Sequence, residues 1–294
     1  MTVSTRHAGF CFTRFVIIES LESFETKTGL ILFEFIQSEL DNAGLTIPIE
    51  YKTCANVVEF REILGVLVHQ ADSQGEIPIL HIECHGDLYG GLEFENGSNL
   101  SWDHLSDALR PLNAATRFNL LACFAACFGA YFIGEISTIK ASPVWAVFAP
   151  TETLDPGEVI AGQQAFYSNF IRTFDAGRAA SATTLLKLET GKWITKTAQE
   201  WFESVVQNYV NTHCNRNEIK IRTMEMYKRQ VFPKRHLSFI KRQLRNANRT
   251  SLTGNYFNTF FMIDKIPENV FRFSETKTRL TWLLSSLRAK GFGV

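Results

Sequence analysis

No uninterrupted apolar run in this sequence approaches the roughly 20 residues that a membrane-spanning helix requires. The opening residues also lack the basic stretch, long apolar run and small-residue cleavage site of a secretory signal peptide. Cysteine is sparse: there are six, and Cys84, Cys123 and Cys127 lie inside apolar segments, which is typical of reduced thiols and not of a disulfide framework. Internal repeats and low-complexity tracts are missing too. We therefore expect a cytoplasmic protein without a membrane span.

The sequence does contain ample apolar and aromatic material for a core. Hydrophobic residues make up 45% of the chain and 25 residues are phenylalanine, which excludes an intrinsically disordered protein. The length of 294 residues suits one large domain or two modest ones.

Charge is distributed unevenly, although the formal net charge is zero. Residues 1–174 contain 9 Lys and Arg against 21 Asp and Glu, whereas residues 175–294 contain 21 against 9. This asymmetry predicts two regions with different surfaces, divided as 1–175 and 176–294. Either the two regions attract each other within one molecule, or the basic region binds an acidic partner.

Short apolar runs alternate with segments of helical periodicity in the first region, which predicts an α/β fold with a mostly parallel sheet. A glycine-rich hairpin is expected over 89–97, with Asn96 and Gly97 in its turn. The second region is expected to be mainly helical. The expected strands are 15–19, 47–51, 77–85, 117–123, 142–149 and 257–264, and the expected helices are 25–43, 56–68, 101–109, 179–188, 193–214, 218–230 and 236–247.

Two of the expected strands end at a reactive side chain, His85 in one and Cys123 in the next. Loops at the carboxyl ends of parallel strands form the binding crevice of such sheets, so the two side chains are expected to meet there. A thiolate is a nucleophile, and an imidazole beside it can take up the thiol proton and later protonate a leaving amine. Gly86 would let the backbone approach a substrate carbonyl and offer an N–H to the developing oxyanion.

Two other cysteines and a metal site are alternatives. Cys127 lies four residues after Cys123 and competes with it, although the expected strand end favours Cys123, and strand alternation should turn Cys84 to the opposite face. His81, Glu83 and His85 alternate on one strand face, and His-x-Glu followed by two cysteines is similar to zinc deaminases. The Cys-x-x-x-Cys spacing without a preceding proline argues against zinc.

The ordered block His81-Ile-Glu-Cys-His-Gly-Asp87, the glycine-rich hairpin, the helix after Ser101 and Phe118-Asn-Leu-Leu-Ala-Cys123 resembles the CHAT branch of the caspase-like cysteine peptidases, the clan of caspases, separase and gingipain. The resemblance implies a three-layer α/β/α fold in 1–175, with 176–294 either extending or completing it. It implies an endopeptidase without cofactor or metal, with His85 as catalytic histidine and Cys123 as nucleophile. The backbone N–H groups of Gly86 and Cys123 would form the oxyanion hole.

The same resemblance bears on substrates and partners. Separase and gingipain place an acidic residue after the fifth strand to receive a basic P1 side chain, which here implies Asp155 or, second, Glu152. The expected partners are a protein substrate and a regulatory protein, in a bacterial defence pathway, with nucleic acid not expected. The alternative is a non-catalytic module of the same fold that binds an acidic partner through its basic region.

Overall fold

The computed structural model describes residues 3–4, 10–135, 139–185, 192–233 and 235–294. The chain divides into two compact units, which are described separately below. Unit 1 comprises residues 1–136 and 142–198, and unit 2 comprises residues 137–141 and 199–294. The boundary therefore lies after Ala198, and not at the change in charge near residue 175.

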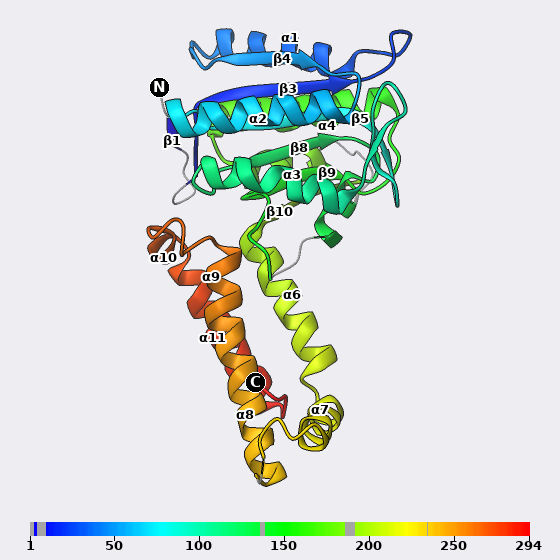
Figure 1. The fold of residues 1–294 in the computed structure, drawn as a ribbon. Helices are drawn as coiled ribbons and strands as arrows, with labels where there is room; N and C mark the ends of the chain where they lie inside the picture. Colours follow the sequence, from blue (N-terminus) through cyan, green and yellow to red (C-terminus); the bar gives the residue numbers. More distant parts are fainter. Residues whose placement is uncertain (1–2, 5–9, 136–138, 186–191, 234) are drawn as a thin grey trace. The chain divides into compact units, whose positions relative to one another are not determined.

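A mixed, mostly parallel sheet forms the centre of unit 1 (Figure 1). Its strands are β3 (Arg14–Ser20), β4 (Ile49–Thr53), β5 (Pro78–Asp87), β8 (Leu121–Ala125), β9 (Ala146–Pro150) and β10 (Trp193–Thr197). They lie in the order β10-β9-β8-β5-β3-β4, with β10 antiparallel to β9 and the other neighbours parallel. Every residue of β3 and of β8 is buried, as expected for strands covered on both faces.

Helices cover both faces of this sheet and make unit 1 a three-layer α/β/α structure (Figure 1). Helices α2 (Val57–Gln74) and α3 (Trp102–Ala115) pack together on one face, and α1 (Thr28–Asn42) and α4 (Pro156–Thr173) pack together on the other. A further helix, α5 (Ala176–Leu185), contacts α4.

Capping residues explain where two of these helices begin. The side chain of Asn56 accepts hydrogen bonds from the first turn of α2, and Asp155 and Glu158 form a reciprocal capping box at α4.

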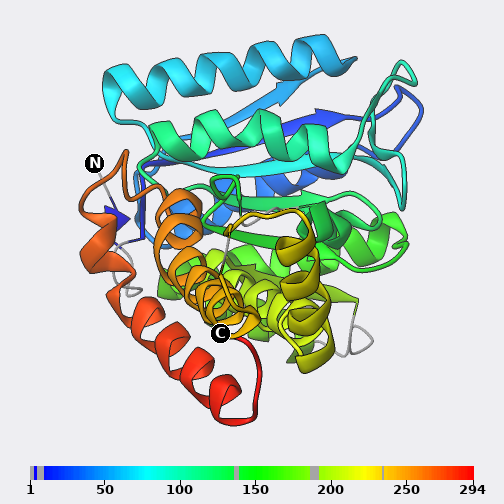
Figure 2. The ribbon, with the colours of Figure 1, turned by 60° about the horizontal axis from the view of Figure 1, so that its bottom comes forward.

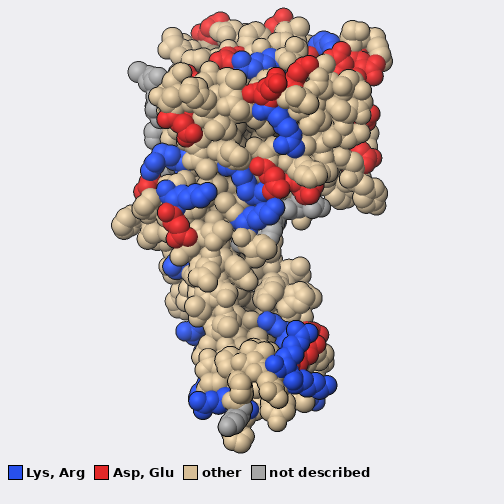
Figure 3. All heavy atoms as spheres, viewed as in Figure 1, with Lys and Arg blue, Asp and Glu red and all other residues tan. Residues whose placement is uncertain are grey.

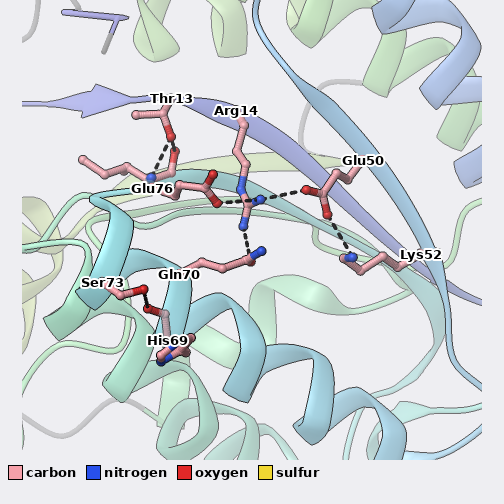
Figure 4. Close-up of polar contacts among 9 residues, drawn as sticks. Thr13, Arg14, Glu50, Lys52, His69, Gln70, Ser73 and Glu76 are labelled. Atoms are coloured by element: carbon pink, nitrogen blue, oxygen red, sulfur yellow. Dashed lines mark hydrogen bonds and ion pairs between the residues drawn. The ribbon is translucent and has the colours of Figure 1, made fainter. Parts of the chain in front are cut away.

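A buried arginine closes the amino ends of the strands (Figure 4). The guanidinium of Arg14 pairs with Glu50 and Glu76 at 2.7 Å each and donates a hydrogen bond to Gln70 at 2.6 Å. These contacts connect β3 to β4 and to the end of α2. Because its charge is paired, Arg14 can remain buried at this end of the sheet.

The hairpin predicted after β5 is confirmed, but β8 begins later than predicted. Strands β6 (Gly91–Glu93) and β7 (Asn99–Leu100) form the hairpin, and Gly97 in its turn has a φ of 79°. Arg117 and Phe118 adopt left-handed conformations with φ of 53° and 67°, so they end the turn after α3 and cannot start an extended strand. Strand β8 therefore starts later than expected and also ends later, at Ala125, so Cys123 lies inside the strand.

Three further element predictions are wrong. Residues 193–214 form an edge strand followed by a helix, because Trp193, Ile194 and Thr195 suit a strand and pair with β9. Residues 257–264 do not form a strand: Phe257, Phe260 and Phe261 recur at helical spacing and are buried. Helix α3 also continues past Pro111 to Ala115.

Unit 2 is helical, and Figure 2 shows its helices in yellow to red. Its core is an aromatic cluster in which Phe202 and Phe261 are central, with ring centroids 5.3 Å apart. Its elements are α6 (Ala198–His213), α7 (Arg216–Lys228), α8 (Leu237–Thr250), a π-helical turn (Ser251–Asn255), α9 (Tyr256–Phe260), α10 (Asn269–Arg272) and α11 (Ser274–Ala289).

Two findings concern the expectations of no membrane span and of reduced cysteines. Across the described residues, none of the helices has both the length and the apolar composition that crossing a lipid bilayer demands. All six cysteines are free thiols.

Candidate active site at the carboxyl ends of β5 and β8

The register between β5 and β8 places His81 opposite Cys123, and Glu83 opposite Ala125 in the last pair of the ladder. Beyond this pair β5 continues through His85 and Gly86, whereas β8 ends and the chain reaches Cys127 two residues later. His85 and Cys127 line the same cavity. We call His81 and Cys123 the lower His–Cys level, and His85 and Cys127 the upper level.

Cys127 follows β8 directly, in a tight turn. The N–H of Gly129 donates to the carbonyl of Ala126 at 3.0 Å, which closes a turn with Cys127 and Phe128 at its centre. Phe128 has a φ of 59°, a left-handed conformation that is costly for a bulky side chain. The turn thus stops the strand and presents Cys127, which is partly exposed, at the carboxyl edge of the sheet.

Gly86 brings the two strand ends into contact. A Cβ placed on Gly86 would overlap the carbonyl oxygen of Cys127 and lie 3.0 Å from its backbone nitrogen. Only a residue without a side chain permits this approach of the two backbones. The N–H of Cys127 donates to no backbone carbonyl among the described residues.

His85 and Cys127 line one cavity of about 160 Å³. Glu25 and Glu83 are among the residues that line it, together with apolar residues at the start of α4, and the described lining includes no Lys or Arg. The lining residues are Leu21, Glu25, Thr26, Thr28, Glu83, Cys84, His85, Ala125, Cys127, Leu154, Pro156 and Val159. The cavity therefore lies where the crevice of a parallel sheet is expected.

The Glu25 carboxylate fixes the imidazole of His85. Glu25 precedes α1, and its Oε1 lies 2.8 Å from Nε2 of His85. A carboxylate only accepts hydrogen bonds, so Nε2 carries the proton and Nδ1 of the neutral ring keeps its lone pair. The His85 side chain is 53% exposed and that of Glu25 is 23% exposed, so both remain accessible from solvent.

The side chains of the lower level are buried, which makes the Cys123 thiol unreactive. Cys123 has no exposed surface, and burial raises the pKa of its thiol to about 12, although a hydrogen bond with Tyr167 opposes the shift. The Tyr167 hydroxyl lies 3.4 Å from Nδ1 of His81, whose Nε2 lies 3.1 Å from Glu83. The prediction that Cys123 ends its strand is therefore wrong, because it lies within β8 and does not line the cavity with His85.

Two buried carboxylates support the floor of the site beside the first turn of α1. Thr28 donates to Glu83 at 2.5 Å, and the N–H of Gly29 donates to Glu19 at 2.7 Å. The positive end of the α1 dipole favours negative charge there. Burial nevertheless raises the pKa of Glu83, while hydrogen bonds from His81 and Thr28 act in the opposite direction.

Neither acidic residue expected to bind a basic P1 side chain lines this cavity. The Asp155 carboxylate caps α4 by accepting from the N–H of Glu158 at 2.9 Å. Glu152 is exposed and lies 3.9 Å from Nζ of Lys192. Their neighbours Leu154 and Pro156 line the cavity instead, so the loop reaches the site but these carboxylates do not.

Two alternatives remain, Cys84 as the nucleophile and a metal site. Cys84 is buried, which raises the pKa of its thiol well above the ordinary value. No group of three or more His, Cys, Asp or Glu in the described ranges is arranged to hold a metal ion, and His81 and Glu83 bond each other.

Sequence reasoning missed Glu25 and underweighted Cys127. Glu25 is the first residue of the helix expected over 25–43, and nothing in its sequence neighbourhood marks it as a partner of His85. Nor does a local signal favour Cys127, because the left-handed conformations of Arg117 and Phe118, which delay the start of β8, are unusual for these residue types.

Comparison of the sequence with models of known protein families and with curated proteins finds no match. The chemistry of the site is therefore argued from its geometry.

Proposed function

We propose that unit 1 is a caspase-like cysteine endopeptidase of the CHAT type with Cys127 as its nucleophile. The observation that carries this proposal is that His85 and Cys127 share one cavity at the ends of adjacent parallel strands, with Gly86 against the Cys127 backbone. The proposal keeps His85 and Gly86 in the roles implied by the sequence and moves the nucleophile from Cys123 to Cys127.

The proposed reaction uses the free nitrogen of His85. Nδ1 takes the thiol proton of Cys127 as Sγ attacks the peptide carbonyl carbon, while the N–H groups of Gly86 and Cys127 donate to the oxyanion. Collapse of this intermediate breaks the C–N bond, and the His85 imidazolium gives its proton to the leaving amine. Water, deprotonated by His85, then attacks the thioester and releases the carboxylic acid and the thiol.

Glu25 is proposed as the residue that orients His85. Its carboxylate holds Nε2–H and so keeps Nδ1 free for the thiol proton. It also stabilises the imidazolium that forms during the reaction.

A basic P1 side chain suits the cavity better than an acidic one. The partly exposed Glu25 carboxylate supplies negative charge, and no Lys or Arg among the described lining residues would neutralise a P1 carboxylate. A preference for Arg or Lys is therefore proposed through Glu25, in place of Asp155 and Glu152.

Hydrolysis of fluorogenic peptides with Arg, Lys, Ala or Asp at P1 tests this proposal. We expect turnover with Arg and Lys, and a loss of at least about 10⁴-fold in kcat/KM for Cys127→Ala. Cys123→Ala is the matched control, and its turnover should stay within about threefold of the wild type because it removes only a buried contact worth about 1 kcal/mol.

The proposal fails if Cys127→Ala cleaves as well as the wild type, or if no peptide is cleaved and a peptide chloromethyl ketone leaves Cys127 unmodified. Preferred cleavage after Asp would refute the P1 assignment alone.

A further inference from the structure

Helix α8 of unit 2 carries a buried face and, adjacent to it, a basic face. Ile240, Leu244 and Asn248 are buried on the first. On the second, four cations fall within about 100° of the helix circumference, given 3.6 residues per turn. These cations are Lys241, Arg242, Arg245 and Arg249.

The basic face of α8 forms the wall of a cleft of about 550 Å³. Arg288 from the end of α11 and Phe292 from the following segment line it as well, and its described lining includes no Asp or Glu. This opposite wall is held in place, because Asn248 donates to the carbonyl of Gly293 at 2.9 Å. The cleft is thus built by two fixed elements of unit 2.

A second cavity of about 1040 Å³ neighbours the cleft at the first residues of α8, where Ser238 lines both. It adds the cations Lys228 and Arg235 and the rings of Tyr227 and Phe232. We call the two cavities together the α8 groove. On the face drawn in Figure 3, Lys and Arg outnumber Asp and Glu on the α7 and α8 part of unit 2.

The cations of the α8 groove are not used for internal ion pairs. Within the described part of the chain, none of its seven Lys and Arg side chains pairs with an Asp or Glu, whereas Arg279 on α11 contacts Glu203 at 2.9 Å. The buried Nε of Arg245 has no hydrogen-bond acceptor. A groove that concentrates unpaired cations is complementary to a polyanion.

We propose that the α8 groove binds single-stranded nucleic acid. Five of its seven cations are Arg, whose guanidinium groups bind phosphates bidentately, and its partly exposed rings offer faces on which bases can stack. An acidic peptide would use the cations but not the rings. The cations of α8 lie along one side of a single helix, which suits one phosphate backbone better than the two of a duplex.

This proposal reverses the expectation that nucleic acid is not a partner. That expectation treated Lys and Arg as ordinary solvent-exposed helix residues, because the sequence does not reveal that α8, α11 and the segment after α7 enclose them. The proposal concerns unit 2 and does not depend on peptidase activity in unit 1.

Fluorescence anisotropy with labelled 12-nucleotide single strands, as RNA and as DNA, tests the proposal on the full chain. We expect binding whose log affinity falls with log salt concentration, with a slope of about −0.7 per phosphate contact. The exposed pair Arg242→Gln/Arg249→Gln should weaken binding at least tenfold and make that slope about 1.4 less steep. The control pair Lys265→Gln/Lys277→Gln removes the same charge outside the groove and should change affinity less than twofold.

Stacking is tested separately by Tyr227→Ser, which keeps every cation and should weaken binding about fivefold or more. Circular dichroism spectra matching the wild type show that the variants are folded. The proposal is overturned if neither strand binds, if a 12-base-pair duplex or a poly-glutamate peptide binds as tightly, or if the groove pair and the control pair behave alike.

Discussion

The two His–Cys levels of unit 1 use the same residue types four positions apart, one level within β5 and β8 and the other at their carboxyl ends, yet they differ in exposure and in hydrogen-bond partners. At the lower level Cys123 is fully buried, its pKa is raised to about 12, and His81 is bonded to Glu83. At the upper level Cys127 is partly exposed, and His85 is held by Glu25 beside a cavity. The comparison teaches that position relative to the strand end, and not the residue pair, separates core from active site.

Replacing the two histidines should give the largest contrast. His85→Gln removes the proposed acid–base group, so kcat/KM should fall by about 10³-fold or more without loss of stability. His81→Gln should instead keep most activity and lower the free energy of unfolding by about 1–3 kcal/mol, because it disturbs the buried partner of Glu83. Peptide kinetics and urea denaturation measure both. Equal kinetic losses in the two variants would remove the distinction between the levels.

A side chain at Gly86 should separate the upper strand ends. In Gly86→Ala the new methyl group overlaps the Cys127 backbone, and displacing the nucleophile should cost about 10²-fold in kcat. Gly65→Ala is the control, because Gly65 lies in α2 with open space around it and should gain about 0.5–1 kcal/mol of stability. Unchanged kcat in Gly86→Ala would show that this close approach is not needed.

The orienting role of Glu25 predicts a smaller effect. Glu25→Gln should lower kcat by about 10- to 100-fold, less than the roughly 10⁴-fold known for a buried orienting carboxylate, since Glu25 is partly exposed. Glu22→Gln, in the same loop, should leave kcat unchanged. A KM effect alone would assign Glu25 to substrate binding.

The buried carboxyl group of Glu83 should make stability depend modestly on pH. Burial raises the pKa of Glu83 above its ordinary value of 4.5, so above that pH the folded state keeps a proton that the unfolded state has lost. The free energy of unfolding therefore falls as the pH rises from 4.5 to the pKa of the folded state. Glu83→Gln cannot titrate and should lose less stability between pH 5 and pH 8 than the wild type, as measured by urea denaturation. Glu62→Gln, an exposed change on α2, should follow the wild type; if Glu83→Gln does too, Glu83 does not carry this dependence.

Periodicity and turn residues were enough to predict much of unit 1. The alternation of strands and helices, the hairpin turn at Gly97 and the cavity at the strand ends near His85 all follow from local patterns. The choice between Cys123 and Cys127 did not, because it depends on where β8 starts. That start is set by the left-handed conformations of Arg117 and Phe118, which are unusual for these residue types.

Features that depend on contacts between distant segments could not be predicted. Glu25 meets His85 across 60 positions, and β10 joins the sheet although its residues continue directly into a helix. The sequence shows that the segment forming α8 is rich in basic residues. It does not show the groove, because Arg288 and Phe292 from the end of the chain line it as well.

The most direct test of the central claim is to map which cysteine of the folded wild type reacts with iodoacetamide at pH 8. Mass spectrometry of the digested protein should find Cys127 alkylated and Cys123 unmodified, because a buried thiol with a pKa of about 12 is neither accessible nor ionised. In 6 M guanidinium chloride both should react, which shows that the difference comes from the fold. Alkylation of Cys123 in the folded protein at a rate equal to or above that of Cys127 would contradict the account.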